Sequence, residues 1–462
     1  MNLFRTKSIA ALQAMAQESG LKKTLSAFDL VCLGIGCVIG TGIFVLTGVA
    51  AAEYAGPGVA LSFLLSGIVC AFVALAYAEF ASMIPSAGSA YTYTYTALGE
   101  MIAFICGWNL ILEYMLATSA VASGWGGYMT GLFKAGGIHL PEALTLVPAD
   151  GGIMNLPAML ILVFLAFLLV RGTHESAAVT RLLVFVKLAA IFIFLVLAVP
   201  NIEPTNWDPF LPFGWEGVSA GAAIAFFAFI GFDAVATSAE ECKNPGRDLP
   251  IGIVGSLAVC TILYVAVSAT LTGVVPYTLL DNAEPVAFAL RHIGYNIGSA
   301  LVAVGAIAGI TSVLLVLLYG MARIVFAMSR DGMLPPGICK VHSKYKTPYL
   351  VTIIGATIAG LGAGFFPIGL IAEMVNIGTL AAFFIASIGV LVLRFTQPNI
   401  ERKFRCPALI VVAPLAALSC AYLMYNLPWD TWVRFGIWTV LGFATYFLYS
   451  YRHSKLGKGE TE

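Results

Sequence analysis

Long apolar runs dominate this chain, and the chemistry of the peptide backbone limits what they can fold into. Each run is long enough for a helix to cross a bilayer, and lipid offers no partner for the N–H and C=O groups of an irregular spanning segment. Only 10% of the 462 residues are charged, against about 25% in soluble domains. The sequence therefore predicts an all-α polytopic membrane protein. The twelve predicted transmembrane helices cover residues 28–51, 58–84, 98–130, 156–171, 177–199, 217–239, 250–276, 298–327, 349–366, 370–393, 405–425 and 430–451.

The basic residues orient these helices across the membrane. With the N-terminus in the cytoplasm, the outside segments hold only Lys134, Arg291 and Arg434 of the 24 lysines and arginines, and Lys187 lies within a span. Positive charge gathers on the cytoplasmic side of membrane proteins. The sequence thus predicts a multi-pass protein of the cell (inner) membrane with both termini in the cytoplasm.

The composition argues against several classes of function. The formal net charge is zero, so nothing implies a nucleic-acid partner. The nine cysteines and five histidines show no metal-ligand spacing, and no nucleophile–base pair points to an enzyme. We therefore expect neither a metal nor an organic cofactor. Membrane lipid is the expected surrounding partner, and protein partners stay open.

Residues 34–48 are apolar, yet glycine interrupts them repeatedly. Glycine within a helix costs about 1 kcal/mol relative to alanine, so Gly40-Thr41-Gly42 predicts a break at membrane depth. The N–H and C=O groups that a break exposes survive only where they are buried in protein or line a cavity. A zwitterionic ligand would satisfy them, with its carboxylate on the N–H groups and its ammonium on the carbonyls. The alternative is a kinked helix whose glycines allow close packing.

A second apolar helix, residues 217–239, is interrupted in the same way. Gly231 lies 191 residues after Gly40, and a carboxylate, Asp233, follows two residues later. Each interrupted helix opens a set of five helices, and because five is odd the second set must cross with the opposite polarity. Paired interrupted segments in two halves indicate a transporter site near the bilayer midplane. The predicted divisions are a cytoplasmic segment 1–27, five-helix repeats 28–199 and 200–393, two further helices 394–451 and a cytoplasmic tail 452–462.

Lys187 lies in the middle of the fifth predicted helix. A charged residue there costs about 2.5–3.5 kcal/mol on insertion scales, and burial disfavours the charged form of lysine. When protonated, its ammonium would bridge carbonyls of the first helix near Ile35 and Gly36 and hydroxyls such as that of Ser312. Lys187 would then act as the proton-coupling group. The alternative is a permanently charged lysine that holds two helices together.

Glu113 and Asp233 are the other acidic residues at depth. Asp233 lies at the second break, where it would orient the unwound backbone, sense closure or relay a proton. Glu113 would face the pocket or pair with another buried group. For both residues, a satisfied hydrogen bond between helices is the structural alternative.

Four stretches of this sequence resemble the amino acid–polyamine–organocation transporters, and most closely the cationic amino acid transporter branch with its bacterial relatives. The resemblance covers nearly the whole chain. It implies a LeuT-like five-plus-five inverted repeat with discontinuous helices 1 and 6, and transport by alternating access. The stretches are residues 36–45, 76–91, 229–245 and 321–332.

The resemblance also implies roles for individual residues. The amides of Gly40 to Gly42 would take a substrate carboxylate, the carbonyls of Val38, Phe227 and Ile230 its ammonium, and Lys187 would stand in for sodium. Phe227 matches an aromatic position that covers the substrate. The predicted substrate-binding residues are Val38, Ile39, Gly40, Thr41, Gly42, Ile43, Glu113, Phe226, Phe227, Ile230, Leu317 and Met321; the predicted gating residues are Phe227 and Asp233, and the predicted proton-coupling residues are Lys187, Asp233 and Glu113.

Three departures from those relatives guide the expected substrate. The chain has room for twelve helices rather than fourteen, Leu317 stands where a small residue is expected, and Glu113 stands where the relatives look uncharged. A leucine would shorten the pocket. We therefore predict a proton-coupled symporter that imports small neutral L-amino acids such as alanine, with arginine or lysine as alternative substrates. An uncoupled exchanger or facilitator is the second hypothesis, and an amino acid-sensing receptor is a third.

Overall fold

The computed structural model describes residues 3–9, 12, 24–84, 89–172, 177–345 and 347–459. Within these residues every named secondary-structure element is a helix, and the sole β contact is a bridge between Leu25 and Cys242. This confirms the predicted all-α class. Most of the predicted segment 1–27 and residues 85–88 of the resembling stretch 76–91 lie outside the described residues.

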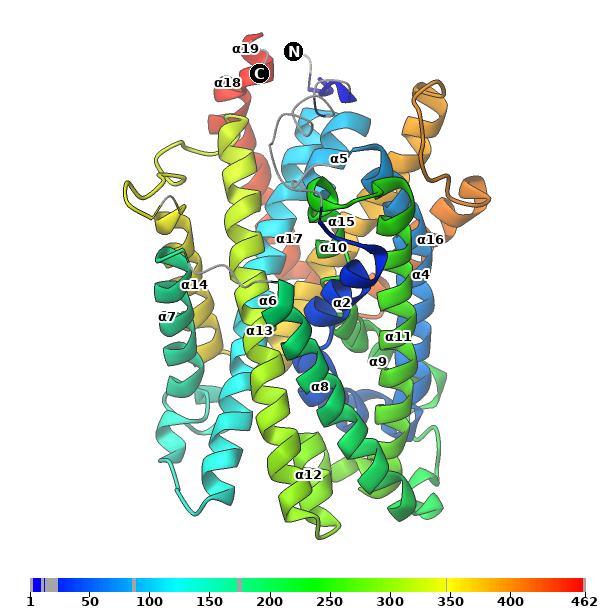
Figure 1. Cartoon of the computed structure of the whole chain (residues 1–462), viewed down its shortest axis with the longest axis vertical. Coiled ribbons are helices and arrows are strands. Elements are labelled where there is room, and N and C mark those ends of the chain that lie inside the picture. The colour runs from blue at the N-terminus through cyan, green and yellow to red at the C-terminus, as the bar shows by residue number, and fades with distance from the viewer. Residues whose placement is uncertain are drawn as a thin grey trace.

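The long helices run side by side along the longest axis of the molecule, and both termini lie at the same end, which we term the tail end (Figure 1). Five helices of 25 residues or more form the body: α4 (Val59–Met83), α6 (Glu100–Ala135), α11 (Pro245–Val274), α13 (Asn296–Arg330) and α15 (Ile368–Thr396).

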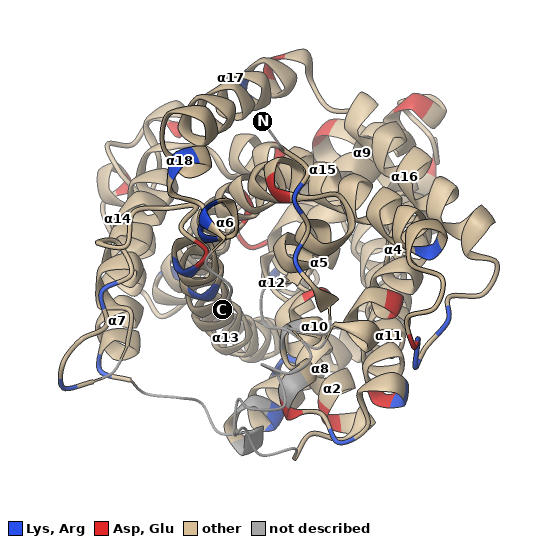
Figure 2. Ribbon diagram, turned by 90° about the horizontal axis from the view of Figure 1, so that it is seen from above, with Lys and Arg blue, Asp and Glu red and all other residues tan. Residues whose placement is uncertain are grey.

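Five medium helices and several short ones complete the bundle. Seen from the tail end, α7, α14, α16 and α17 lie at the periphery, whereas α5, α10 and α12 lie toward the middle (Figure 2). The medium helices are α7 (Leu156–Val170), α8 (Ala177–Ala198), α14 (Tyr349–Phe365), α16 (Leu409–Tyr425) and α17 (Trp429–Thr445). The short ones are α2 (Ala27–Val38), α3 (Thr47–Val49), α5 (Ser89–Ala97), α9 (Gly214–Ala225), α10 (Ala234–Thr237), α12 (Pro285–His292), α18 (Tyr451–His453) and α19 (Lys455–Lys458).

The described residues contain seven helices long and apolar enough to cross a membrane, or eight if α16 and α17, bent by 115°, count as one span. Shorter apolar helices add α2, α7 and α14. Helical segments occupy each of the twelve predicted stretches. A polytopic membrane protein is therefore confirmed, whereas the count of twelve spans and the inverted repeat stay predictions.

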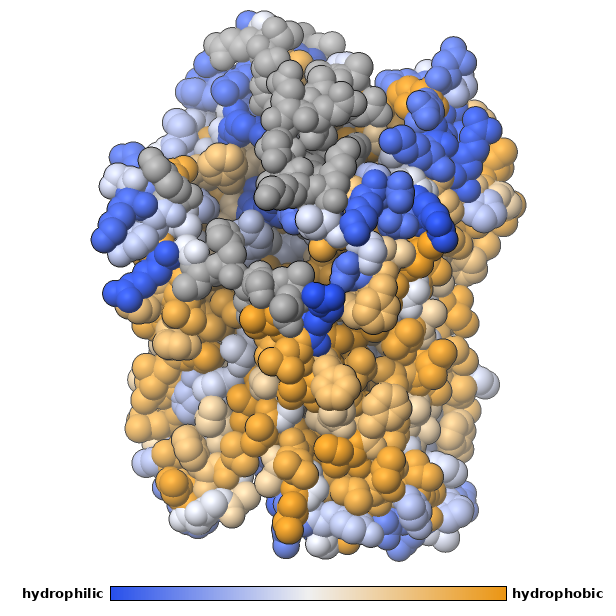
Figure 3. Space-filling view, in the orientation of Figure 1, coloured by the Kyte–Doolittle hydropathy of each residue, from blue (hydrophilic) through white to orange (hydrophobic). Residues whose placement is uncertain are grey.

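The surface has the polarity that a bilayer requires. Apolar residues form a broad band over the body, and hydrophilic residues gather at the tail end and at the opposite end (Figure 3). Large apolar side chains on the helices, such as Phe185 on α8 and Ile262 on α11, are each 70% exposed and would be unfavourable in water. Lipid is the solvent in which this surface is stable.

Close helix contacts hold the body together. On α4, a Cβ added to Gly67 would lie 2.6 Å from a side-chain atom of Thr261 on α11. Small residues at such contacts bring helix backbones close and gain van der Waals packing, which drives association in lipid. Most of the two interrupted segments, residues 27–55 and 214–237, is buried inside this bundle.

Candidate functional site

The first interruption lies between α2 and the helical segment that follows it. Helix α2 ends at Val38, and Ile39 is extended, with φ −75° and ψ 104°. The chain rewinds as a π-helix over Gly42–Leu46 and continues through α3 and a second π-helix, Ala50–Ala55. The predicted break is confirmed, but it is centred on Ile39 and Gly40 rather than on Gly40-Thr41-Gly42.

The second interruption lies between α9 and α10. Helix α9 ends at Ala225, and a 3₁₀ turn covers Phe226–Phe229. Ile230 is then extended, and Gly231 has φ +108°. That backbone conformation strains any residue with a Cβ, which explains why glycine stands at this break. The second predicted interruption is confirmed where it was expected.

The two interruptions touch each other. A Cβ on Gly42 would lie 2.3 Å from the Cα of Ala228, and a Cβ on Gly231 would lie 3.1 Å from the carbonyl oxygen of Cys37. Gly42 therefore serves close packing, the alternative that the sequence left open, because its neighbour is backbone that cannot give way. The break itself begins at Ile39, three residues before Gly42, so the prediction placed it slightly too late in the chain.

One tyrosine hydroxyl joins both interruptions. The Oη atom of Tyr264 on α11 lies 2.9 Å from the carbonyl oxygen of Val38 and 2.8 Å from that of Ala228. Its single proton is shared between two acceptors that the breaks leave without helical partners. Sequence reasoning missed Tyr264, since a tyrosine within an apolar helix carries no distinguishing signal.

Lys187 on α8 caps the end of α2. Its Nζ donates to the carbonyl oxygens of Gly36 at 2.8 Å and of Ile39 at 2.9 Å, and the side chain is fully buried. A cation fits there because the last carbonyls of a helix lack partners and form the negative end of its dipole. The predicted contact with Gly36 is confirmed. The Ser312 hydroxyl, expected near the lysine, donates to the carbonyl of Gly309.

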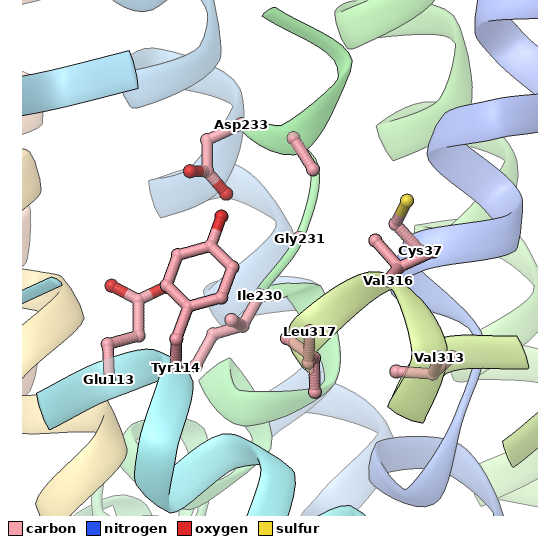
Figure 4. A pocket seen from close by; sticks show the side chains of 10 residues that line it. Cys37, Glu113, Tyr114, Ile230, Gly231, Asp233, Val313, Val316 and Leu317 are labelled. Carbon is pink, nitrogen blue, oxygen red and sulfur yellow. The ribbon is translucent and has the colours of Figure 1, made fainter. Parts of the chain in front are cut away.

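A pocket lies beside the two interruptions, between α6, α13 and the second break (Figure 4). In this conformation the space left between the lining side chains is narrow, with room for about one water molecule. One wall is aliphatic and the other carries two carboxylates. The lining residues are Cys37, Glu113, Tyr114, Ile230, Gly231, Asp233, Ala234, Val313, Val316 and Leu317.

The two carboxyl groups of this pocket are incompletely satisfied. Glu113 and Asp233 are each 1% exposed, and Oε2 of Glu113 and Oδ1 of Asp233 have no hydrogen-bond partner. The Tyr114 hydroxyl is directed toward Asp233 (Figure 4). Buried polar atoms without partners are costly, so a ligand, a proton or ordered water would be favourable here.

The structure brings four of the predicted site residues together in the pocket: Glu113, Asp233, Ile230 and Leu317. Met321 is buried at α14, where a Cβ on Gly355 would collide with it. The predicted residues that lie along the two interruptions without lining the pocket are Val38, Ile39, Gly40, Thr41, Gly42, Ile43, Phe226 and Phe227.

Six lining residues were absent from the predicted site residues, although one of them, Gly231, had been predicted as the second interruption. Val313 and Val316 lie four and one residues before Leu317 on α13, so helical periodicity from Leu317 would have found them. Tyr114 follows Glu113 with no signal of its own. Cys37, Gly231 and Ala234 flank the breaks, and the glycine pattern could have included them.

The tail end of the bundle is closed by polar contacts. Lys7 Nζ lies 2.6 Å from Oδ1 of Asp331, and the Tyr91 hydroxyl donates to Oδ2 of the same carboxylate at 2.7 Å. Glu100, fully buried, accepts from the hydroxyl of Ser454 at 2.6 Å. Segments from both ends of the described chain therefore cover α5 and the end of α13.

The opposite end is closed by close packing around glycines, beside an ion pair. A Cβ on Gly48 would lie 2.3 Å from the carbonyl oxygen of Leu280, and one on Gly131 would lie 2.1 Å from the carboxylate of Glu284. Glu284 is paired with Arg291 at 2.5 Å. The segment that leads into α12 thus lies directly on the first interrupted helix and on α6.

Sequence comparison decides the family. A family profile described as amino acid permease matches residues 25–448. The chain belongs to the amino acid permease family. It is 50% identical over 463 aligned residues to the branched-chain amino acid permease BcaP of Bacillus subtilis (strain 168), covering 99% of both chains. It is 48% identical to the methylthioribose transporter of the same organism, over 99% of this chain and all of that protein.

More distant relatives include cationic amino acid transporter 1 of Arabidopsis thaliana, 34% identical over 96% of this chain and 76% of the relative. The resemblance to the cationic amino acid transporter branch and its bacterial relatives is therefore confirmed. These relatives are transporters, so the prediction that the chain is not an enzyme is confirmed as well. This permease is a multi-pass membrane protein.

Proposed function

We propose that this permease imports neutral L-amino acids with small to medium apolar side chains, by proton-coupled symport and alternating access. The observation that carries the proposal is that two interrupted helices meet beside a pocket that has an aliphatic wall and two buried carboxyl groups. The proposal includes twelve spans in a five-plus-five inverted repeat, with the tail end in the cytoplasm.

Backbone groups would hold the zwitterion. After the first break, the N–H groups around Gly40 to Gly42 begin a new helical segment and have no partner one turn earlier. The positive end of a helix dipole favours a carboxylate at that place. The carbonyls of Phe227 and Ile230 at the second break would accept from the substrate ammonium, with Phe227 covering the site.

The aliphatic wall would select the side chain. Val313, Val316 and Leu317 line the pocket from α13, and each buried CH₂ group of a substrate gains about 0.8 kcal/mol against such a wall. Alanine would leave part of the wall empty, whereas valine or leucine would fill it. BcaP, half identical to this chain, is named for branched-chain amino acids. Arginine and lysine are the alternative, favoured by Glu113 and Asp233 and opposed by Leu317.

Lys187 would couple transport to protons. Its ammonium holds the carbonyls of Gly36 and Ile39 in the geometry of the break, as a bound cation would. A neutral amine would lose the charge that makes these hydrogen bonds strong. Protonation of Lys187 would therefore favour the substrate-binding shape of α2, and Asp233 and Glu113 would pass or store protons in the pocket.

The test is uptake of labelled leucine and alanine into proteoliposomes with an inward proton gradient. We expect accumulation that collapses with the gradient and is lost in Lys187→Met, while counterflow without a gradient persists in that variant. Uptake by the unmodified permease that ignores the gradient would refute the coupling and leave the uncoupled exchanger. The same assay with no amino acid transported would refute the substrate class.

A second candidate substrate is a thioether sugar. Oε2 of Glu113, Oδ1 of Asp233 and the Tyr114 hydroxyl offer hydrogen-bonding atoms that suit sugar hydroxyls, and the aliphatic wall would take a methylthio group. The 48% identical relative is named for methylthioribose. Thermal shift with methylthioribose beside the twenty amino acids separates the two: stabilisation by the sugar alone would favour this candidate.

A further inference from the structure

We propose that Ser89, the first residue of α5, is a positioning residue that links Asp233 in the pocket to the closed tail end. The inference rests on the proposed transport function, because it assigns Ser89 to the gate through which a transported substrate would leave. Ser89 is fully buried and lies outside the pocket lining.

Its backbone is strained. Ser89 has φ +51°, and among the described residues only one other non-glycine residue, Ala408, has positive φ. A residue with a Cβ rarely adopts this conformation and persists in it only where the surroundings impose it. The strain at Ser89 therefore points to contacts that hold its side chain in one place.

Those contacts form a chain of hydroxyls ending on Asp233. The Ser89 hydroxyl donates to Oδ2 of Asp233 at 3.3 Å, and the hydroxyls of Tyr77 and Ser89 share a short hydrogen bond. A serine hydroxyl has one proton, so Tyr77 donates to Ser89 and Ser89 donates to Asp233. The chain joins α4, α5 and α10, and all three side chains are at most 1% exposed.

The two carboxylate oxygens of Asp233 have different surroundings. Oδ2 accepts from Ser89, whereas Oδ1 belongs to the carboxylate that lines the pocket and has no hydrogen-bond partner. A ligand that draws Asp233 toward the pocket therefore acts on the bond to Ser89. The position of α10 and the start of α5 are coupled through one carboxylate.

Helix α5 carries this coupling to the tail end. Two residues after Ser89, the Tyr91 hydroxyl donates to Asp331, which also binds Lys7. At the end of α5, the Tyr95 hydroxyl donates to Glu100 at 3.2 Å. The nine-residue helix α5 thus contacts Asp233 of the pocket through its first residue and the polar groups that close the tail end through its later residues. Loss of the Ser89–Asp233 bond should loosen that closure.

The experiment compares two backbone-matched variants. Ser89→Gly removes the hydroxyl and accepts the positive φ, so the fold is not penalised. Ala408→Gly serves as the control. It relieves the other positive φ at a residue that precedes α16 and does not line the pocket. Ser89→Ala, which keeps the strain and loses the hydroxyl, checks that the hydroxyl is responsible.

The readout is labelling of Cys37, a thiol that lines the pocket, by a membrane-impermeant maleimide in inside-out membrane vesicles, measured by mass spectrometry. We expect labelling at least threefold faster in Ser89→Gly and Ser89→Ala than in the unmodified permease, and unchanged in Ala408→Gly. Rates unchanged in both Ser89 variants would overturn the inference, whatever their thermal stability. Faster labelling in a protein that transports no amino acid would support the gate and refute the proposed function alone.

Discussion

Tyr264→Phe should weaken substrate binding by loosening the join between the two interruptions. The variant keeps the ring, which packs edge-on against Phe63 and Phe229, and removes only the hydroxyl that bonds the carbonyls of Val38 and Ala228. Leaving a buried acceptor unsatisfied costs about 1–3 kcal/mol. Because 1.4 kcal/mol is tenfold in affinity, the dissociation constant should rise between about fivefold and a hundredfold if the whole loss falls on binding.

The control is Tyr128→Phe, the same chemical change elsewhere. The Tyr128 hydroxyl on α6 donates to the carbonyl of Phe44 at 2.9 Å, inside the rewound helix and away from the breaks. Isothermal titration of the purified permease with its transported amino acid should show the large rise for Tyr264→Phe. For Tyr128→Phe the change should stay within about twofold, the scatter of uncoupled sites. Equal changes in both variants would refute the claim that Tyr264 shapes the site.

Three further predictions concern packing, selectivity and closure. Gly42→Ala should lower uptake more than tenfold, since its Cβ would meet the Cα of Ala228 at 2.3 Å. The control Gly436→Ala, with no atom within 4 Å of the added Cβ, should transport normally. Normal uptake by Gly42→Ala would contradict the close contact between the two interruptions. Leu317→Ala should shift preference toward longer side chains and cost about 2–5 kcal/mol of stability, measured by competition uptake and thermal unfolding; an unchanged preference would remove Leu317 from the selectivity wall. Lys7→Ala removes a hydrogen-bonded ion pair with Asp331. The loss of about 1 kcal/mol of closure free energy should speed maleimide labelling of Cys37 from the tail end about fivefold. An unchanged labelling rate would show that this ion pair does not contribute to the closure.

Local chemistry made some of the site predictable. Lys187 stood out because a lone cation in an apolar helix must find oxygen partners, and the first helix, already expected to break, was the nearest source of them. Gly231 was identified because a carboxylate follows it two residues later within an apolar run, and a continuous helix in lipid would gain nothing from either residue. Both predictions depend on charged side chains, whose burial is costly unless hydrogen bonds or an opposite charge compensate it.

Tertiary contacts made the rest unpredictable. Gly42 looks like part of the break in sequence, and only the approach of Ala228 shows that it serves packing. Tyr264 and Ser89 take their importance from acceptors more than thirty residues away along the chain. Met321 was assigned to the pocket by resemblance, but its rotamer fills a gap at Gly355 instead. A sequence shows which groups need partners and leaves open which partners the fold supplies.

The two closures differ in kind, and this difference bears on how the permease would open. At the tail end, Lys7, Tyr91 and Ser454 close the path through hydrogen bonds to the carboxylates of Asp331 and Glu100, which water can replace one at a time. At the opposite end, the ion pair of Glu284 and Arg291 accompanies a backbone contact between Gly48 and Leu280. That backbone contact is either made or lost. Graded opening is therefore expected on the tail side, and an all-or-none displacement of the α12 segment on the other.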